Sequence, residues 1–174
     1  MHQYGARRKP RINQELTMSS DLMTSGLQLT AILLISLVMG AVFGVWRGYN
    51  PALLSASTFV EMQQGAIRGL NLLLPALGLA CLLATAALAA LSRNRPPVLG
   101  LYLTALAAIA IAGLVTRFGN QPINAQMMHW SAASLPNNWA NIRDKWWTLH
   151  LVRLCASFAG EVMLIAAIFA DRTA

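Results

Sequence analysis

Four long segments almost free of charged side chains constrain the fold of this chain more than any other feature. Three of them are 25, 24 and 21 residues long, and the fourth has 17 residues with Glu161 as its one charge. About 20 apolar residues are enough for a helix to cross a hydrocarbon core of ~30 Å. We therefore predict four transmembrane helices, near residues 24–46, 67–91, 98–116 and 148–170.

The composition agrees with a membrane protein. The 174 residues are 56% hydrophobic and only 11% charged, whereas a soluble domain carries about 25% charged residues. We predict an all-α, integral membrane four-helix bundle in which residues 21–174 form one domain. The first span is too long for a cleaved signal peptide, so we expect the chain to retain it. Residues 1–20 are polar and basic, and we expect a disordered cytoplasmic tail there.

The basic side chains indicate how the chain crosses the membrane. The net charge is +7, but most Lys and Arg residues lie at the ends of the predicted spans, where they set topology. We therefore expect no nucleic acid as a partner. Seven basic residues fall on the side of the two termini and six on the other. This small bias favours a cell-membrane protein with both termini in the cytoplasm.

Glycines recur every four residues near the end of the first span, at Gly40, Gly44 and Gly48. They share one helix face, and the absence of side chains on that face lets another helix approach closely. We expect this face to pack within the chain. The alternatives are a seam between two copies in a homo-oligomer and a groove for a flat ligand.

A polar stripe precedes the second span. Its members are three or four residues apart and so lie on one helix face; they are Glu61, Gln64, Arg68 and Asn71. This stripe faces either water or the polar stretch that follows the third span, because both connections emerge on the same side of the membrane. Pro75 follows the stripe and is expected to cause at most a kink.

The connection over residues 117–147 is long for an unstructured loop. We predict a turn at residues 120–124, a short helix from about Pro122, and a second turn over residues 134–138. From about Pro136, one helix can continue to Ala170. The additional short helix therefore belongs to the connection between the third and fourth spans.

The last helix carries a polar and aromatic face. At 100° per residue, seven side chains lie within about 40° of one line; these are Trp139, Arg143, Trp146, His150, Arg153, Ser157 and Glu161. The opposite side is aliphatic and suits lipid, so we expect the polar face to point into the bundle. Glu161 lies about 12 Å deeper than Arg153 by helical rise and cannot pair with it. We expect Glu161 to bond a group on another helix, with Ser36 and Thr104 as candidates.

This face suggests a chemistry for the chain. An ordinary histidine titrates near neutral pH, so His150 is a candidate general base. Arg143 and Arg153 flank it, and two fixed cations suit a substrate that becomes an anion. The alternatives are that His150 is a satisfied core residue and that the arginines bind phospholipid head groups.

Aromatic and amide side chains extend the same candidate site. Trp139, Trp146 and Trp147 offer flat surfaces to an aromatic ring. Asn120 and Asn124 offer amide hydrogen bonds from the preceding connection. The alternative for the tryptophans is a belt at the membrane interface.

Metal and thiol chemistry have weak support in the sequence. A metal held by His129, His150 and Glu61 is conceivable, but these residues form no recognised ligand spacing. Cys81 and Cys155 lie inside predicted helices without a CxxC motif, which argues against a thiol–disulfide oxidoreductase. The chain has no metal, flavin or nicotinamide motif, so we expect no cofactor.

The arrangement of these residues resembles a known family. The motif begins with Asn120-x-Pro122-x-Asn124 and a following tryptophan, Trp130. It continues at the head of the last span with Trp139, Arg143, Trp146, His150 and Arg153. Together with the Gly-x3-Gly first helix, this pattern is similar to the DUF1772 family of small four-helix membrane proteins, which includes the anthrone oxygenases of aromatic polyketide pathways. The resemblance covers most of residues 25–170.

The resemblance implies a cofactor-independent oxygenation, in which an anthrone is deprotonated and its carbanion reduces dioxygen to give a quinone. In that case His150 is the base, and Arg143 and Arg153 stabilise the enolate. In that scheme Asn120 and Asn124 orient the oxygen atoms of the substrate, and Trp139 and Trp146 stack on its rings. We add Trp130 from the same motif, and Glu61 and Gln64 from the polar stripe, as candidate substrate-binding residues. The expected partners are the lipid bilayer and a hydrophobic aromatic small molecule. The alternative is a non-enzymatic membrane protein that binds lipid or another hydrophobic ligand, or that serves as a small subunit of a membrane complex.

Overall fold

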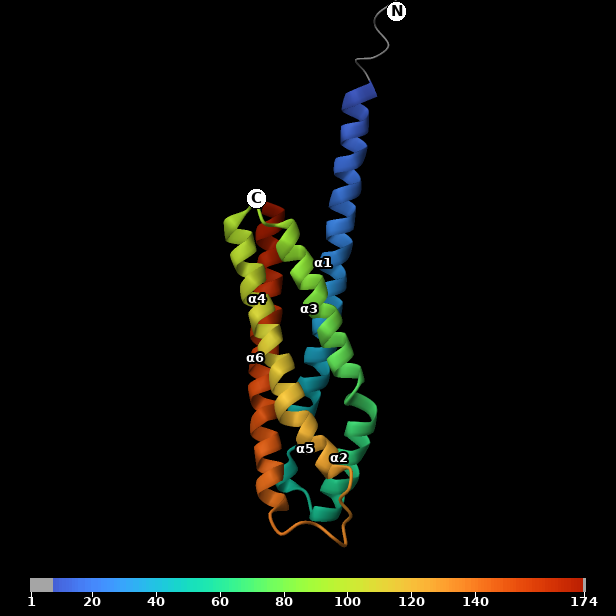
Figure 1. Cartoon of the computed structure of the whole chain (residues 1–174), viewed down its shortest axis with the longest axis vertical. Helices are drawn as coiled ribbons and strands as arrows, with labels where there is room; N and C mark the ends of the chain where they lie inside the picture. Colours follow the sequence, from blue (N-terminus) through green and yellow to red (C-terminus); the bar gives the residue numbers. More distant parts are fainter. Residues whose placement is uncertain (1–7, 174) are drawn as a thin grey trace, which may run out of the picture.

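The computed structural model describes residues 8–173, and every regular element in that range is a helix. Four of these helices are long and apolar enough to cross a membrane, which confirms the predicted four-span, all-α architecture. They are α1 (Arg8–Gly48), α3 (Leu73–Leu91), α4 (Pro96–Leu114) and α6 (Trp139–Thr173). Figure 1 shows them running along the long axis of the molecule, with α2 and α5 at the end away from the C-terminus.

Helix α1 is longer than the sequence predicts. It begins at Arg8 and projects beyond the rest of the bundle (Figure 1). The predicted disordered tail over residues 1–20 is therefore wrong for residues 8–20, and residues 1–7 lie outside the described range. Extending an existing helix needs no new nucleus, and Pro10 lies in the first turn, where a missing N–H breaks no helical hydrogen bond.

The spanning helices are held together most closely between α4 and α6. Gly160 makes this contact possible, because a Cβ atom at that position would lie only 2.8 Å from Cγ1 of Ile109. At the end where the C-terminus lies, Gln28 of α1 and Arg95 before α4 both bond the carboxylate of Asp171, each at 2.6 Å. This carboxylate therefore ties α1 and α4 to α6.

The helical path into the second span is interrupted at Asn71 and Leu72, just before Pro75, where the sequence allows at most a kink. Helix α2 (Ala56–Leu70) ends before Asn71 and Leu72, and both residues keep right-handed helical backbone angles. Proline has no N–H to offer the carbonyl four residues earlier, which is that of Asn71. Nε2 of Gln121 donates to this carbonyl instead, at 3.2 Å. A side chain from another part of the chain thus completes the hydrogen bonding at this interruption.

The predicted turn at residues 120–124 is wrong, because the helix continues through it. Helix α4 passes into a π-helical turn, η2 (Val115–Asn120), and then into α5 (Gln121–Met127). The N–H of Gln121 donates to the carbonyl of Thr116, five residues back. Pro122 therefore lies in the first turn of α5, which confirms the predicted short helix.

Two further connections close this end of the bundle. Asn50 caps the short 3-10 helix η1 (Pro51–Leu53) by accepting a hydrogen bond from the N–H of Ala52 at 3.1 Å. The irregular segment over residues 128–138 contains the second predicted turn. Helix α6 begins three residues later than predicted, at Trp139.

The glycine face of α1 does not pack within the chain, contrary to our expectation. Gly40, Gly44 and Gly48 are exposed, and a Cβ atom added to any of them would have no other atom within 4 Å. Contact between two copies through this face stays a prediction.

Candidate functional site

The polar face of α6 points into the bundle, as its spacing predicts. Trp146, His150 and Ser157 are buried, and the other four members of the face are half-buried. These side chains therefore meet groups from the other helices. Trp146 and His150 in particular lie too deep to form an interfacial belt.

His150 is enclosed by its neighbours on the same helix. Its side chain is 0% exposed, and its ring stacks with the rings of Trp146 and Trp147 at centroid distances of 5.4 and 5.3 Å. Nδ1 of His150 lies 2.8 Å from Nη2 of Arg153. A guanidinium group can only donate, so Nδ1 accepts this hydrogen bond and the ring proton is on Nε2. Nε2 is buried without a hydrogen-bond partner.

Arg153 carries a positive charge that no carboxylate neutralises. Among the described residues, the ion pairs within 4.0 Å are Arg95 with Asp171 and Arg143 with Asp144. Nε of Arg153 is buried and has no hydrogen-bond partner. An unpaired guanidinium inside a helical membrane protein is costly and is usually part of a functional site. Arg153 is therefore the strongest candidate for contact with a ligand.

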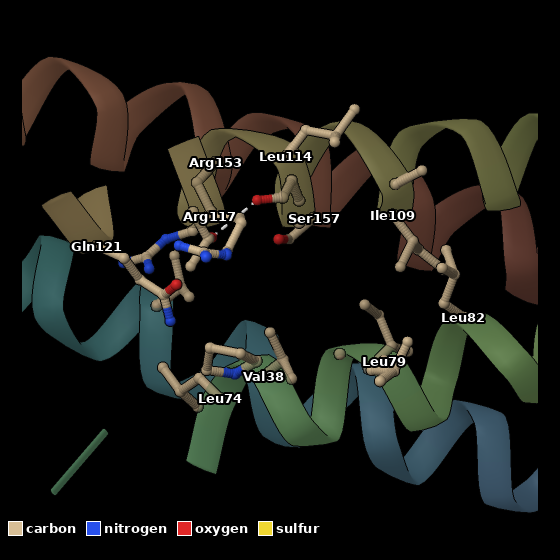
Figure 2. A pocket seen from close by; sticks show the side chains of 18 of the residues that line it. Val38, Leu74, Leu79, Leu82, Ile109, Leu114, Arg117, Gln121, Arg153 and Ser157 are labelled. Atoms are coloured by element: carbon tan, nitrogen blue, oxygen red, sulfur yellow. Dashed lines mark hydrogen bonds between the residues drawn. The ribbon is translucent and has the colours of Figure 1, made fainter. Parts of the chain in front are cut away.

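Arg153 lines a pocket of about 430 Å³ between α1, α3, α4 and α6. This volume is in the range of small-molecule sites. Most of the wall is aliphatic and includes Ile35, Leu79, Leu82 and Ile109. Figure 2 shows Arg153, Arg117 and Gln121 gathered at one end, while Leu82 and Ile109 lie at the other. The pocket is therefore polar and cationic at one end and apolar along the rest of its length.

A smaller cavity of about 50 Å³ adjoins the same guanidinium. The two cavities share five lining residues, which are Val42, Leu74, Pro75, Thr116 and Arg153. Its wall is largely apolar but includes several polar side chains, among them Tyr49, which donates a hydrogen bond to Gln63 at 2.8 Å. Arg153 thus contributes to the walls of both cavities.

The asparagines of the predicted motif hold the smaller cavity together. Nδ2 of Asn124 donates to Oδ1 of Asn71, and Oδ1 of Asn124 accepts from Nε1 of Trp146, both at 2.8 Å. Asn124 and Trp146 line this cavity. Asn120 is 0% exposed, donates to the carbonyl of Trp146 at 3.2 Å and lines neither cavity. The motif therefore joins α5 to α6 and to the interruption before α3.

The structure places several predicted site residues away from both cavities. Trp130 and Trp139 pack on Phe59, with ring centroids 6.5 and 5.9 Å apart. Gln64 donates to the carbonyls of Met127 and Trp130 at 3.1 and 2.9 Å. These contacts belong to a cap formed by η1, α2, α5 and the segment before α6, and they close the end of the bundle.

Charged members of the predicted site also lie apart from the cavities. Arg143 pairs with the neighbouring Asp144 at 2.9 Å, and its guanidinium carbon lies 5.1 Å from the ring centroid of Trp139. Glu61 is exposed on α2. His150 itself lines neither cavity, because Arg153 lies between its Nδ1 atom and the pocket. Of the three residues predicted to be catalytic, Arg153 alone contributes to the wall.

Sequence reasoning missed Arg117 and Gln121 at the polar end. Arg117 was counted as a topology signal, since it directly follows the third span. The two residues lie in the stretch where η2 passes into α5, so the angular positions of an ordinary α-helix do not predict their direction. Arg117 is exposed and lines the pocket from its edge. The available signal was its place directly after the third span, where a long side chain can lie along the apolar surface with its charged end free.

Glu161 has the partner that its depth suggested. Oγ of Ser36 donates to Oε1 of Glu161 at 2.7 Å, which confirms Ser36 as one of the two candidates. The other candidate, Thr104, donates to the carbonyl of Gly100 instead. Glu161 lines neither cavity and belongs to the contact between α1 and α6.

The described residues include no group of three or more His, Cys, Asp or Glu side chains placed to hold a metal ion.

Comparison with known proteins shows to which family this chain belongs. The model of the anthrone oxygenase family matches residues 64–163, a stretch that runs from α2 to the middle of α6 and includes Arg117, His150 and Arg153. No curated protein and no solved structure matches the chain.

Proposed function

Because this chain belongs to the anthrone oxygenase family, we propose that it oxidises an anthrone- or hydroquinone-type aromatic with dioxygen and without a cofactor. The observation that carries the proposal is the unneutralised guanidinium of Arg153 in the wall of an apolar pocket. A fixed cation in such surroundings stabilises an anion that forms beside it far more than water does.

The enolate of an anthrone is such an anion. Its oxygen would lie at the polar end, beside Arg153, with Arg117 and Gln121 close to any further oxygen atoms of the substrate. The aromatic rings would occupy the aliphatic chamber. Removing one preorganised donor of this kind from an enzyme costs about 10²–10³ in rate, which sets the size of effect expected for Arg153.

His150 supplies the base in this scheme. Arg153 covers its Nδ1 atom at 2.8 Å, and the hydrogen bonds of catalysis often form only with substrate bound. When the guanidinium turns to the substrate oxygen, Nδ1 is uncovered and can accept the proton from the carbon opposite the carbonyl. A single movement of the Arg153 guanidinium would then both stabilise the substrate anion and free Nδ1 of His150 to act as the base.

The remaining steps balance without another reactant. The carbanion transfers one electron to dioxygen, the carbon radical and superoxide combine to form a C–O bond, and the peroxide anion takes up the proton from His150 to give a hydroperoxide. Loss of water, with the second hydrogen of that carbon, leaves a carbonyl group. In sum, a CH2 group and O2 become C=O and H2O.

The test is turnover by the full chain in lipid nanodiscs with anthrone and dioxygen. Oxygen uptake and anthraquinone absorbance should rise in equal amounts in the wild type. Arg153→Gln should lose at least about 100-fold of the rate, while Arg93→Gln, in the exposed turn between α3 and α4, should stay within about twofold. Wild-type protein that produces no quinone, or an Arg153→Gln variant at full rate, would remove the proposal.

A second candidate is a binding protein for a hydrophobic ligand. The observation that favours it is the aliphatic wall of the pocket, which needs no chemistry to hold an apolar molecule. Saturable binding of 1,8-dihydroxyanthraquinone without any oxygen uptake on anthrone would decide for this function.

A further inference from the structure

The large pocket opens between α3 and α4. Three residues of its wall are also strongly exposed on the outer surface: Leu79 is 57% exposed, Leu114 55% and Phe118 73%. Leu79 belongs to α3, and the other two belong to α4 and η2. A residue that lines a cavity and also faces outward marks the rim of its mouth. The rim of this mouth is apolar.

Glycines keep the mouth free of side chains. Gly78 of α3 and Gly113 of α4 both line the pocket. Apart from its chain neighbours and the nearby backbone of its own helix, a Cβ atom added to either one would have no atom within 4 Å. The space between the two helices at this level is therefore not filled by the chain itself.

Helical rise places this mouth at membrane depth. Arg95 and Asp171 mark one boundary of the bundle, and Arg153 lies 18 residues before Asp171 on α6, or ~27 Å away at 1.5 Å per residue. That is close to the thickness of a hydrocarbon core of ~30 Å. Ile109, at the apolar end, lies 14 residues after Arg95, or ~21 Å from the same boundary. The pocket thus extends from the boundary away from the termini toward the middle of the bilayer.

The pocket therefore has the polarity profile of the lipid leaflet beside it. Its cationic end lies at the level of the lipid head groups, and its aliphatic end lies among the acyl chains. A molecule with oxygen atoms at one end and a flat apolar body would have the same orientation in the leaflet as in the pocket. It could pass between α3 and α4 without turning over and without crossing water.

We propose that the gap framed by Gly78, Gly113 and Phe118 is a lateral entrance, through which a membrane-dissolved polycyclic phenol or enol enters from the leaflet opposite the termini. The chemical class of this ligand rests on the proposed function, whereas the route rests on the mouth of the pocket. Arg153 receives the oxygen-bearing end. We expect this route to favour molecules dissolved in the bilayer over water-soluble relatives of the same ring system, because Leu79, Leu114 and Phe118 at the rim are apolar.

The test blocks the gap with a side chain that the fold can accept. Gly113→Phe and Gly78→Phe place a ring in the mouth, where a Cβ atom meets nothing. Gly100→Phe is the matched control, because Gly100 is exposed on the same helix as Gly113, also meets nothing, and does not line the pocket. Circular dichroism and thermal unfolding of all three variants check that the bundle is intact.

The measurement is the loading rate of 1,8-dihydroxyanthraquinone. Proteoliposomes holding the full chain are mixed with vesicles that carry this probe, and quenching of tryptophan fluorescence is followed by stopped flow. Gly113→Phe and Gly78→Phe should slow both loading and release at least tenfold, while Gly100→Phe stays within twofold. If the new ring instead filled the pocket, the variant would bind the probe more weakly and release it faster. That result would overturn the proposed entrance.

Three other outcomes have defined meanings. Loading of Gly113→Phe at the wild-type rate, or loading of water-soluble anthraquinone-2-sulfonate that the variant does not slow, overturns the lateral route. A wild type that never binds the dihydroxy probe overturns the ligand class. Loading that the glycine variants slow, in a protein that never oxidises anthrone, leaves the entrance standing and removes the proposed function alone.

Discussion

Nη2 of Arg153 donates to Nδ1 of His150 over 2.8 Å, so the two residues proposed to carry the reaction are bonded to each other. His150 is buried and Arg153 is half-buried, and each has one buried nitrogen without a hydrogen-bond partner, Nε in Arg153 and Nε2 in His150. Arg153 therefore keeps a free donor beside the pocket that it lines, whereas His150 lines neither cavity.

Removing either member should disable the same step. We expect His150→Phe, which keeps a ring between Trp146 and Trp147, and Arg153→Gln each to lower kcat for anthrone oxidation by about 100-fold or more. The double variant should be no more than about threefold slower than the worse single variant, because residues that act as a unit are not additive. Losses that multiply in the double variant would mean that the two residues act independently.

Gln121 should matter for stability only while Pro75 is present. Its amide bonds the Asn71 carbonyl that Pro75 leaves without a donor. Gln121→Leu should therefore lower the free energy of unfolding by about 1 kcal/mol. In a Pro75→Ala background, the new backbone N–H serves that carbonyl, and the same substitution should cost close to nothing. Thermal unfolding of the four proteins measures this coupling, with Gln126→Leu on the exposed side of α5 as the control. Equal losses in both backgrounds would contradict it.

Asn124→Ala should loosen the cap. It deprives Nε1 of Trp146 and Oδ1 of Asn71 of their partners at once, and leaving buried polar groups unpaired costs about 1–3 kcal/mol each. We expect a lower melting temperature and a red shift of tryptophan emission, whereas Gln126→Ala on the same helix should change neither. Adding Trp146→Phe removes one orphaned donor and should recover part of the loss. No recovery would show that the hydrogen bond to Trp146 is not what stabilises the cap.

Ser36→Ala should separate stability from activity. Oγ of Ser36 donates to Glu161 at 2.7 Å, and neither residue lines a cavity. The expected loss is about 1 kcal/mol in the free energy of unfolding, with anthrone oxidation within twofold of the wild type. Thr30→Ala is the control on α1, because its hydroxyl bonds only a carbonyl of its own helix. A large loss of turnover in folded Ser36→Ala protein would place Glu161 in the reaction.

Regular helical geometry made much of this structure predictable. The face from Trp139 to Glu161 follows from 100° per residue along one uninterrupted helix, and the bond between Ser36 and Glu161 follows from equal depth in the membrane. Pro75 predicted at most a kink. The side chain that bonds the Asn71 carbonyl in place of the missing N–H belongs to Gln121, 46 positions after Pro75, and local sequence does not predict it.

The rest depends on contacts that local sequence does not encode. The π-helical turn shifts the angular position of every residue after Val115, which hid Arg117 and Gln121. Arg143 has the same spacing as Arg153, but Asp144 and Trp139 hold it outside the cavities. The pocket itself exists because α3 and α4 leave space at Gly78 and Gly113, and that space depends on how whole helices pack.

The apolar mouth between Leu79 and Leu114 bears on which substrate concentration, that in the bilayer or that in water, would set the rate of turnover. A site that opens into lipid samples the mole fraction of substrate in the bilayer, and aqueous concentration enters only through partitioning. If the total amount of substrate is fixed, adding empty vesicles would lower the mole fraction of substrate in the bilayer. Turnover would then slow, although the protein itself is unchanged. With the proposed activity and entrance, the Michaelis constant would be a ratio of substrate to lipid, and the product would return to the same leaflet.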